Sequence, residues 1–332
     1  MNLLINLPPD FFTQPELLDR WAGLEARFSV RKTSHNTPEE IETDLAWADL
    51  VIMWSWPVLD EKLLAKVGAL KFAGHIDLNQ TGARCELAAG IPVSTSRAGF
   101  SPAVAEMALG LILNGLRRIS DYHAAMRAGT ETWVQAFPKD SPPLERELSG
   151  ARVGIVGLGK VGRRLAELLQ PFHVELKVVD PYVSDEVIAT FGGQRRDIDA
   201  AVGEVDILVL CAANNDGTRR LLNAERIARL PKNALLINVA RADILDYAAL
   251  AARLEKGDLL AALDVFEREP LAADFPLRRL PNTYLSPHRA GGLIASVQRN
   301  IDWLIADLDL VLAGKPRQFA VTAAMIPGLD HA

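Results

Sequence analysis

Residues 152–180 read RVGIVGLGKVGRRLAELLQPFHVELKVVD, and this stretch decides the fold. It begins with the short apolar run 153–156, which is typical of a buried parallel strand. The spacing G-x-G-x-x-G follows at Gly157, Gly159 and Gly162. In such a turn the first glycine permits a tight bend, the second lets the backbone approach a pyrophosphate, and the third lets the next helix pack closely against the strand. The order of strand, turn and helix therefore predicts a dinucleotide-binding α/β sheet.

The acid that ends this stretch indicates which dinucleotide binds. Asp180 follows a second strand-like run at 174–179 and lies about 20 residues beyond the last glycine, the offset of a ribose-binding acid. A carboxylate there accepts a hydrogen bond from the adenosine 2′-hydroxyl and repels a 2′-phosphate, so we expect NAD rather than NADP. A glycine-rich turn alone is equally consistent with a structural role, and the flanking strand, helix and acid favour the cofactor. The turn residues expected to bind NAD are Gly157, Leu158, Gly159, Lys160, Val161 and Gly162.

Length and composition exclude several classes of protein. The 332 residues suffice for two domains, and contents of 49% hydrophobic and 23% charged residues are typical of a globular chain. A net charge of −6 disfavours a nucleic-acid surface. Neither a signal peptide nor a membrane span of about 20 apolar residues is evident, so a cytoplasmic location is expected. With two cysteines and no zinc-ligand spacing, we expect neither a disulfide framework nor a metal site.

Strand-like and helix-like stretches alternate on both sides of a long central helix, which predicts two parallel α/β domains. Before that helix they lie at 3–7, 15–23, 38–46, 50–54, 60–67 and 70–73. After the glycine motif they lie at 206–211, 223–230, 234–240, 246–256, 259–266 and 283–286. The central helix is expected at 102–119, with Ser101 as its N-cap and Pro102 in its first position. The proline-containing segment 130–149 is expected to form an extended arm, and a last helix at 292–313 to return the chain to the first domain.

Three polar residues each follow a predicted strand of the second domain, where open α/β sheets bind their ligands. They are Arg241, Glu269 and His288. Each one alone is as well explained by a structural role, for example an arginine that caps a strand or a histidine in a loop. Their shared position at strand ends in a nucleotide-binding domain makes them candidates for catalysis.

With these residues the sequence resembles the D-2-hydroxyacid dehydrogenase family. The resembling motifs are GLGKVG with Asp180, NVARADILD around Arg241, LDVFEREP ending after Glu269, and SPHRAGG around His288. The resemblance implies a Rossmann-type doubly wound domain at 101–293, which includes the linking helix and a dimerisation arm. It also implies a smaller, flavodoxin-like substrate domain that is discontinuous in sequence, at 1–100 and 294–332. A homodimer that binds NAD and a small 2-keto or 2-hydroxy acid is therefore expected.

The roles implied by the resemblance agree with the chemistry of keto-acid reduction, which needs a hydride on the carbonyl carbon and a proton on its oxygen. A histidine suits the proton transfer because its unperturbed pKa of about 6.5 lies near working pH. His288 would transfer the proton, Glu269 would orient its ring, and Arg241 would bind the substrate carboxylate through its planar fork. The resemblance also assigns Ala240 and Asp264 to the cofactor, with Asp264 at the nicotinamide carboxamide.

The match weakens at the expected carboxylate-binding loop, residues 74–79, which looks about two residues shorter than the glycine-rich loop of the family. His75 and Asp77 either contact a polar or bulky substrate or form a purely structural salt bridge. The candidate substrate-binding residues are Trp54, His75, Ile76, Asp77 and Arg241. The tryptophan pair at 54 and 56 either lines a pocket for a substrate larger than pyruvate or serves packing.

Two further departures and two alternative functions stay open. Ala242 replaces the glycine that usually follows the arginine, a mild change unless the backbone there needs a positive φ. Arg289 beside His288 would disfavour the protonated imidazole unless it points away, or would instead recruit a second anionic group. One alternative function is an NAD-sensing interaction protein similar to the C-terminal-binding corepressors. The other is a dehydrogenase of formate or phosphite on the same scaffold.

Overall fold

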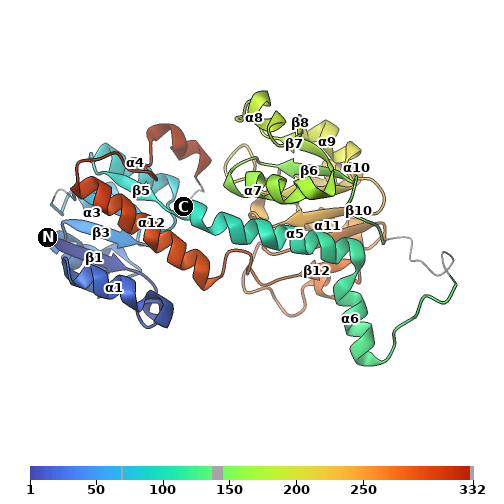
Figure 1. Cartoon of the computed structure of the whole chain (residues 1–332), viewed down its shortest axis with the longest axis horizontal. Coiled ribbons are helices and arrows are strands. Elements are labelled where there is room, and N and C mark those ends of the chain that lie inside the picture. The colour runs from blue at the N-terminus through green and yellow to red at the C-terminus, as the bar shows by residue number, and fades with distance from the viewer. Residues whose placement is uncertain (69, 137–144, 330–332) are drawn as a thin grey trace. The chain divides into compact units, whose positions relative to one another are not determined.

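The computed structural model describes residues 1–68, 70–136 and 145–329, which form two compact units that each contain one parallel sheet (Figure 1). Unit 1 consists of Met1–Phe100 and Gly292–Ala332, and unit 2 consists of Ser101–Gly291. Unit 1 is therefore discontinuous in sequence, and unit 2 lies between its two segments along the chain.

The sheet of unit 1 has the strand order β2-β1-β3-β4-β5, and all neighbouring strands pair in parallel. Its strands are β1 Asn2–Asn6, β2 Ser29–Thr33, β3 Leu50–Met53, β4 Phe72–His75 and β5 Val93–Thr95. This is the flavodoxin-like order, in which the chain reverses direction across the sheet between β1 and β3. The predicted flavodoxin-like class is thus confirmed for this unit.

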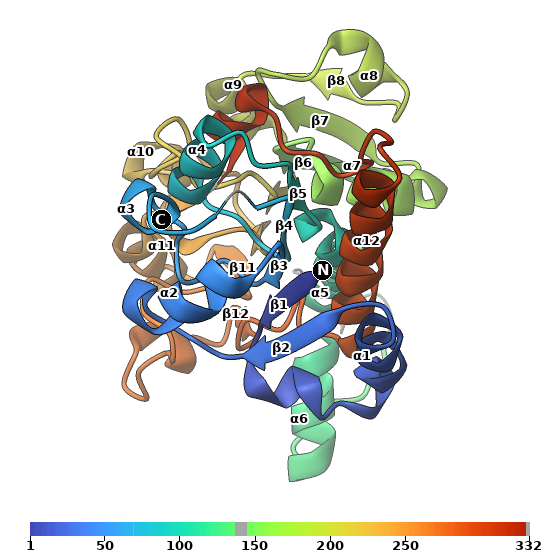
Figure 2. The same ribbon diagram turned by 90° about the vertical axis from the view of Figure 1, so that its left-hand side faces the viewer.

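Helices cover both faces of this sheet because its central strands are apolar on both sides. One face packs against α1 Leu18–Glu25 and α12 Ile294–Leu312, and Figure 2 shows α12 lying along it. The opposite face packs against α2 Pro38–Trp47, α3 Glu61–Leu64 and α4 Gln80–Ala88. In β1, Leu3 and Ile5 enter the first core while Leu4 enters the second, which is the two-residue alternation of a strand.

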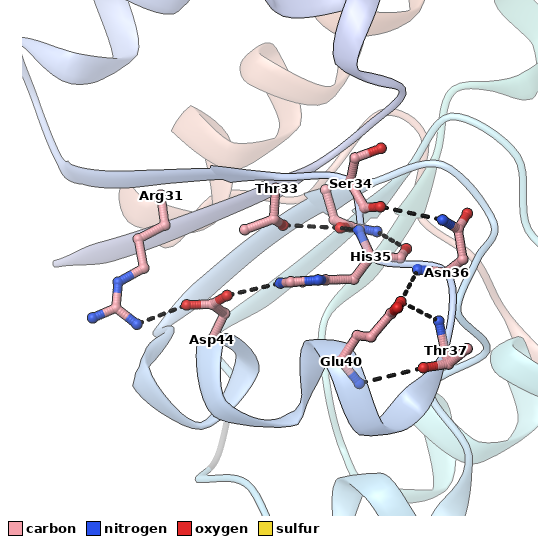
Figure 3. Close-up of polar contacts among 9 residues, drawn as sticks. Arg31, Thr33, Ser34, His35, Asn36, Thr37, Glu40 and Asp44 are labelled. Atoms are coloured by element: carbon pink, nitrogen blue, oxygen red, sulfur yellow. Dashed lines mark hydrogen bonds and ion pairs between the residues drawn. The ribbon is translucent and has the colours of Figure 1, made fainter.

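A buried asparagine ties together the loops at the carboxyl edge of this sheet. Asn6, 1% exposed, accepts hydrogen bonds from Thr33 Oγ1 and His35 N, both at 2.8 Å. Its Nδ2 donates to the carbonyls of His35 and Trp56 at 3.1 and 3.0 Å. Figure 3 shows His35 and Arg31 approaching the carboxylate of Asp44 from either side. The hydrogen bond from His35 lowers the pKa of Asp44, so this loop is held by charge as well as by Asn6.

Unit 2 contains a doubly wound parallel sheet of the Rossmann type, as predicted. Its strands are β6 Arg152–Val156, β7 Glu175–Val179, β8 Gln194–Arg195, β9 Ile207–Leu210, β10 Ala234–Asn238, β11 Leu259–Leu263 and β12 Thr283–Leu285. Their order is β12-β11-β10-β9-β6-β7-β8, with every pair of neighbours parallel. The winding reverses between β6 and β9, which places the glycine turn at the switch point where such sheets bind ligands.

Both faces of this second sheet are also covered. The core on one face contains residues of α5 Ser101–Arg117, α7 Lys160–Leu169 and α8 Asp185–Ala189. The core on the other contains residues of α9 Ile198–Glu204, α10 Ala224–Arg229 and α11 Tyr247–Leu254. In β10, Leu235 and Ile237 point to the first face and Leu236 to the second. Strands buried on both faces explain the continuous apolar runs in the sequence.

The central helix differs from its expected form. It begins at Ser101 directly after a 3₁₀ turn, so Ser101 is not a separate N-cap, and it ends at Arg117. Arg118 adopts a left-handed backbone conformation with φ of 51°, and a separate helix, α6 Ile119–Ala128, follows. The break is held by Asp121, which pairs with Arg118 at 2.8 Å and accepts from Tyr284 Oη at 2.7 Å. As a result α6 extends away from the sheet of unit 2 (Figure 1).

By length and composition alone, the segment Arg97–Arg117 is long and apolar enough to cross a membrane. The expectation that the chain contains no such segment is therefore wrong. Half of its most apolar window is buried in the protein, and Ala105, Ala108 and Ile112 belong to the core of unit 2. Its packing therefore identifies it as a core helix of unit 2. These three side chains are buried, so they do not contribute to an exposed apolar face.

Several elements were not expected from the sequence. They are β2, α4, β5, α6, α8, β8 and α9. β2 is an edge strand with the sequence SVRKT, and charged residues on an edge strand hide the apolar pattern. Short 3₁₀ turns lie at Pro9–Phe12, Pro15–Leu17, Arg97–Phe100, Gln170–Phe172, Ala242–Ile244, Pro276–Arg279 and Ala323–Gly328. Residues 137–144 of the expected arm, which include Pro138, Pro142 and Pro143, lie outside the described residues.

Candidate functional site

The glycine turn has the geometry of a phosphate-binding turn. Gly157 has a φ of 92°, and a Cβ there would lie 2.7 Å from the backbone of Ala212. A Cβ at Gly162 would lie 2.1 Å from the carbonyl oxygen of Gly157, so α7 packs against the strand only without a side chain. A Cβ at Gly159 would meet nothing within 4 Å. The protein's own packing therefore requires the first and third glycines, and the second leaves open space beside the N-terminus of α7, where a pyrophosphate fits.

Asp180 joins this turn to the end of β7. Its Oδ2 accepts a hydrogen bond from Leu158 N at 2.7 Å, and its Oδ1 accepts from Tyr182 N and Val183 N at 2.9 and 3.1 Å. A carboxylate offers about four lone-pair positions, so one remains for a ribose hydroxyl. The group is half-buried at the carboxyl end of its strand. The residues of the turn and Asp180 thus fit the adenosine half of NAD.

His288 and Glu269 are in contact. Glu269 Oε2 lies 2.6 Å from His288 Nδ1, and Glu269 Oε1 accepts from Phe266 N at 2.9 Å. The backbone bond fixes the carboxylate, and the carboxylate in turn fixes the imidazole. The side chain of His288 is 50% exposed, so the ring is accessible while Nδ1 is engaged. This arrangement leaves Nε2 to exchange a proton with a ligand.

Arg241 follows β10 and therefore lies at the same edge of the sheet. The turn that carries it is held by Asn238, which accepts from Ala240 N and donates to the carbonyl of Arg241, both at 3.1 Å. Ala242 begins a 3₁₀ turn and has no positive φ, so alanine in place of the usual glycine introduces no strain. Ala240 is buried, and its amide is already used by Asn238.

The carboxylate of Asp264 is engaged by the loop that carries His288. The residue follows β11 and is 1% exposed. It accepts hydrogen bonds from Ser286 Oγ, Arg289 N and Ala290 N at 2.5, 2.8 and 2.9 Å. Its expected contact with a carboxamide stays a prediction.

In unit 1 the structure buries two of the candidate substrate residues. His75 is 2% exposed, and its Nε2 lies 2.9 Å from Glu86 Oε2 while its Nδ1 lies 3.2 Å from the carbonyl of Trp54. Ile76 is fully buried in the core beside it. Asp77 is partly exposed and pairs with Arg97 at 3.4 Å. The side chain of His75 is thus buried in a structural pair with Glu86, and not with Asp77, which pairs with Arg97 instead.

Trp54 lies at the carboxyl end of β3 within an aromatic cluster. Its ring centroid is 5.7 Å from that of Phe11, 5.5 Å from Trp56 and 6.1 Å from Phe100. These distances are those of favourable edge-on and tilted pairs. All four rings keep partial exposure, so the cluster combines packing with a surface open to a ligand.

Sequence reasoning missed Glu86, Arg97 and Asn238. Glu86 carried one signal, since it falls three residues after buried Ala83 on the face of α4 that packs inward. A charged residue at such a position is tolerated only with a partner. Nothing in the sequence identified His75 as that partner.

Comparisons with known proteins identify the family of this chain. Residues 109–290 match the family described as "D-isomer specific 2-hydroxyacid dehydrogenase, NAD binding domain". The chain is 30% identical over 320 residues to a D-3-phosphoglycerate dehydrogenase of Methanocaldococcus jannaschii, covering 95% of this chain and 59% of that one. It is 34% identical over 245 residues to a glyoxylate reductase of Thermofilum pendens, covering 73% and 69%. A solved phosphoglycerate oxidoreductase from Rhizobium etli superposes with a TM-score of 0.75 at 26% identity, covering 97% and 98%. The chain therefore spans only part of the first relative.

The buried pair of His75 and Glu86 predicts a pH-dependent contribution to the stability of unit 1. Burial opposes the charged imidazolium, but the carboxylate of Glu86 outweighs this effect and raises the pKa of His75. Stability from a raised histidine pKa is complete below the unfolded pKa of about 6.5 and is lost as pH rises through the folded one. Glu86→Gln should therefore lower the free energy of unfolding by about 3 kcal/mol near pH 6 and by less near pH 9.

Urea unfolding followed by tryptophan fluorescence at both pH values measures this difference. Besides Glu86, the groups that face His75 are the carbonyl of Trp54 and the carboxylate of Asp77. Asp77→Asn is the matched control, because Asp77 is partly exposed and bonds to Arg97 rather than to the imidazole. An equal loss for Glu86→Gln at both pH values contradicts the charged pair.

Proposed function

Because this chain belongs to the D-isomer-specific 2-hydroxyacid dehydrogenase family, we propose that it transfers a hydride reversibly between NAD and a 2-keto or 2-hydroxy acid. The observation that carries the proposal is the 2.6 Å contact of His288 Nδ1 with Glu269 Oε2 at the carboxyl edge of the sheet that bears the glycine turn. An accessible histidine held by a carboxylate is the group that a carbonyl reduction needs.

His288, Glu269 and Arg241 of unit 2 have different roles in the proposed reaction. The bound nicotinamide supplies or accepts the hydride. His288 gives a proton from Nε2 to the carbonyl oxygen in reduction and takes it back in oxidation. Glu269 keeps the ring oriented and offsets the positive charge of the protonated form. Arg241 binds the carboxylate through two parallel N–H groups and polarises the carbonyl for attack.

The substrate class rests on two supports. The relatives named above carry the names of a phosphoglycerate dehydrogenase and a glyoxylate reductase, whose substrates and products are small 2-hydroxy and 2-keto acids. Partial exposure of Trp54 and its ring neighbours at the switch point of the unit 1 sheet supports a substrate with an apolar side chain. We therefore assign a small or medium 2-keto acid.

Apolar side chains on α6 support a homodimer. Ile119, Tyr122 and Met126 lie on one face of this helix with 55%, 37% and 52% of their surface exposed, and Trp133 beyond it is 69% exposed. Adjacent exposed apolar groups of this kind mark interaction surfaces. The proposed occupant is a second copy of the chain, and a cytoplasmic location accords with the proposed metabolic role.

Replacing His288 tests the proposed activity. His288→Ala removes the proton donor, so kcat with a reactive 2-keto acid and NADH should fall by about a hundredfold or more. The Kd for NADH, measured by tryptophan quenching, should stay within about twofold because the glycine turn is intact. His123→Ala, an exposed histidine on α6, is the control and should retain activity. Full activity of His288→Ala excludes His288 as the proton donor. NADH binding by the wild type without turnover of any acid in a panel excludes the proposed reaction and favours an NAD sensor.

Replacing Asp180 tests the choice of cofactor. Asp180→Ala removes the repulsion of a 2′-phosphate, so the ratio of kcat/KM for NADH to that for NADPH should fall about tenfold or more. Asp185→Ala removes an exposed acid on the neighbouring helix and should leave the ratio unchanged. A ratio that stays at the wild-type value in Asp180→Ala shows that other residues select the cofactor.

A charge on the exposed face of α6 tests the dimer. Met126→Glu should convert a dimeric mass in light scattering to a monomeric one, because burying an unpaired carboxylate in an interface costs several kcal/mol. Ala124→Glu puts the same charge on the opposite face of the helix and should leave the dimer intact. A monomeric wild type contradicts the assignment.

A further inference from the structure

The turn that carries His288 is strained. His288 has a φ of 51°, which is the left-handed region that side chains other than glycine rarely adopt. Such a conformation is unfavourable for a residue with a Cβ and persists only where surrounding groups fix it. Glycine would relieve the strain but would remove the imidazole. Other contacts must therefore hold the backbone at this position.

Those contacts converge on Asp264, which directly follows the neighbouring strand β11. The amide of His288 donates to the carbonyl oxygen of Asp264 at 2.8 Å. The next two amides donate to its carboxylate, that of Arg289 to Oδ1 at 2.8 Å and that of Ala290 to Oδ2 at 2.9 Å. Ser286 Oγ donates to Oδ1 at 2.5 Å from the other side of the turn. The groups that donate to the carboxylate thus come from residues that precede and follow His288 in sequence.

Consecutive amides beside a left-handed residue form a concave anion-binding site, or nest. In this chain the anion is internal, since the carboxylate of Asp264 occupies the nest of residues 288–290. Hydrogen bonds from N–H groups to an ionised carboxylate are about twice as strong as those between neutral groups. Their combined strength is sufficient to offset the strain at His288.

The geometry points to Asp264 as the positioning residue of His288: its buried carboxylate fills the nest and so directs the imidazole onto Glu269. This inference rests on the proposed role of His288 as proton donor. Asp264 acts through the turn and does not itself touch the substrate. Asp264 is 1% exposed, and three of the about four lone-pair positions of its carboxylate accept hydrogen bonds from the loop that carries His288. Most of its hydrogen-bonding capacity is therefore used to hold this loop.

The chain offers a matched control for the loss of such an anchor. Asp307, fully buried in unit 1, accepts from Ser94 Oγ at 2.7 Å and from the consecutive amides of Gln318 and Phe319 at 2.7 and 2.9 Å. It therefore has the same donor set as Asp264 but holds a segment that carries none of the proposed catalytic residues. A purely structural effect should be common to both aspartates.

The test compares Asp264→Asn, Ser286→Ala and Asp307→Asn with the wild-type chain. Three quantities are measured: kcat at saturating NADH, the Kd for NADH, and the downfield NMR resonance of the His288 Nδ1 proton, assigned by its absence in His288→Ala. In Asp264→Asn we expect kcat to fall about tenfold to a hundredfold and the resonance to be lost, with a Kd within about twofold. Ser286→Ala keeps the charge and should lower kcat about threefold to tenfold.

Asp307→Asn should lower the thermal midpoint as much as Asp264→Asn does, while kcat and the resonance stay at wild-type values. If Asp264→Asn weakens NADH binding but keeps kcat and the resonance, Asp264 serves the cofactor alone and the inference is overturned. If Asp264→Asn does not fold, Ser286→Ala decides, and an unchanged kcat and resonance there overturns the inference. If the wild type reduces no keto acid, the proposed function fails, and the resonance still shows whether Asp264 holds the ring.

Discussion

The carboxyl ends of parallel strands all lie at one edge of their sheet, and the candidate site depends on this constraint. In unit 2 the register places Asn238 of β10 beside Leu263 of β11, and Leu263 beside Leu285 of β12. The residues that follow these strands, Arg241, Glu269 and His288, therefore emerge in neighbouring positions although they are far apart in sequence. The glycine turn after β6 lies at the same edge. Apolar burial on both faces fixes this register, because a shift by one residue exchanges the two cores.

Buried polar side chains at the strand ends convert this common edge into a defined arrangement. Asn238 closes the turn before Arg241, and Asp264 closes the turn around His288. The amide of Asp264 also donates to the carbonyl of Asn238 at 3.0 Å, so the two anchors are linked. A polar group buried without partners would cost several kcal/mol, and a loop without anchors would sample many conformations. Each therefore stabilises the other.

Much of the fold and the centre of the site could be predicted from the sequence. Strands buried on both faces appear as apolar runs, and the glycine spacing and Asp180 are local signals that need no knowledge of distant contacts. Features that depend on long-range contacts could not be predicted. The edge strand β2 lacks an apolar pattern, the break before α6 depends on Tyr284 from β12, and the pairing of Glu86 with His75 crosses from a helix to a strand. The loop bonds of Asp264 likewise join residues more than 20 positions apart.

Asp180 performs two tasks with one carboxylate. The carboxylate that we propose for ribose binding also holds Leu158, Tyr182 and Val183 in place. Discrimination between cofactors and the integrity of the turn are therefore not separable at this position. In evolution a lineage that adopted NADPH through this residue would first lose rigidity in the turn, and a compensating acceptor for the Leu158 amide would have to precede or accompany the change. If Asp180 selects NAD as proposed, this preference is thus protected by the backbone bonds of the turn as well as by charge.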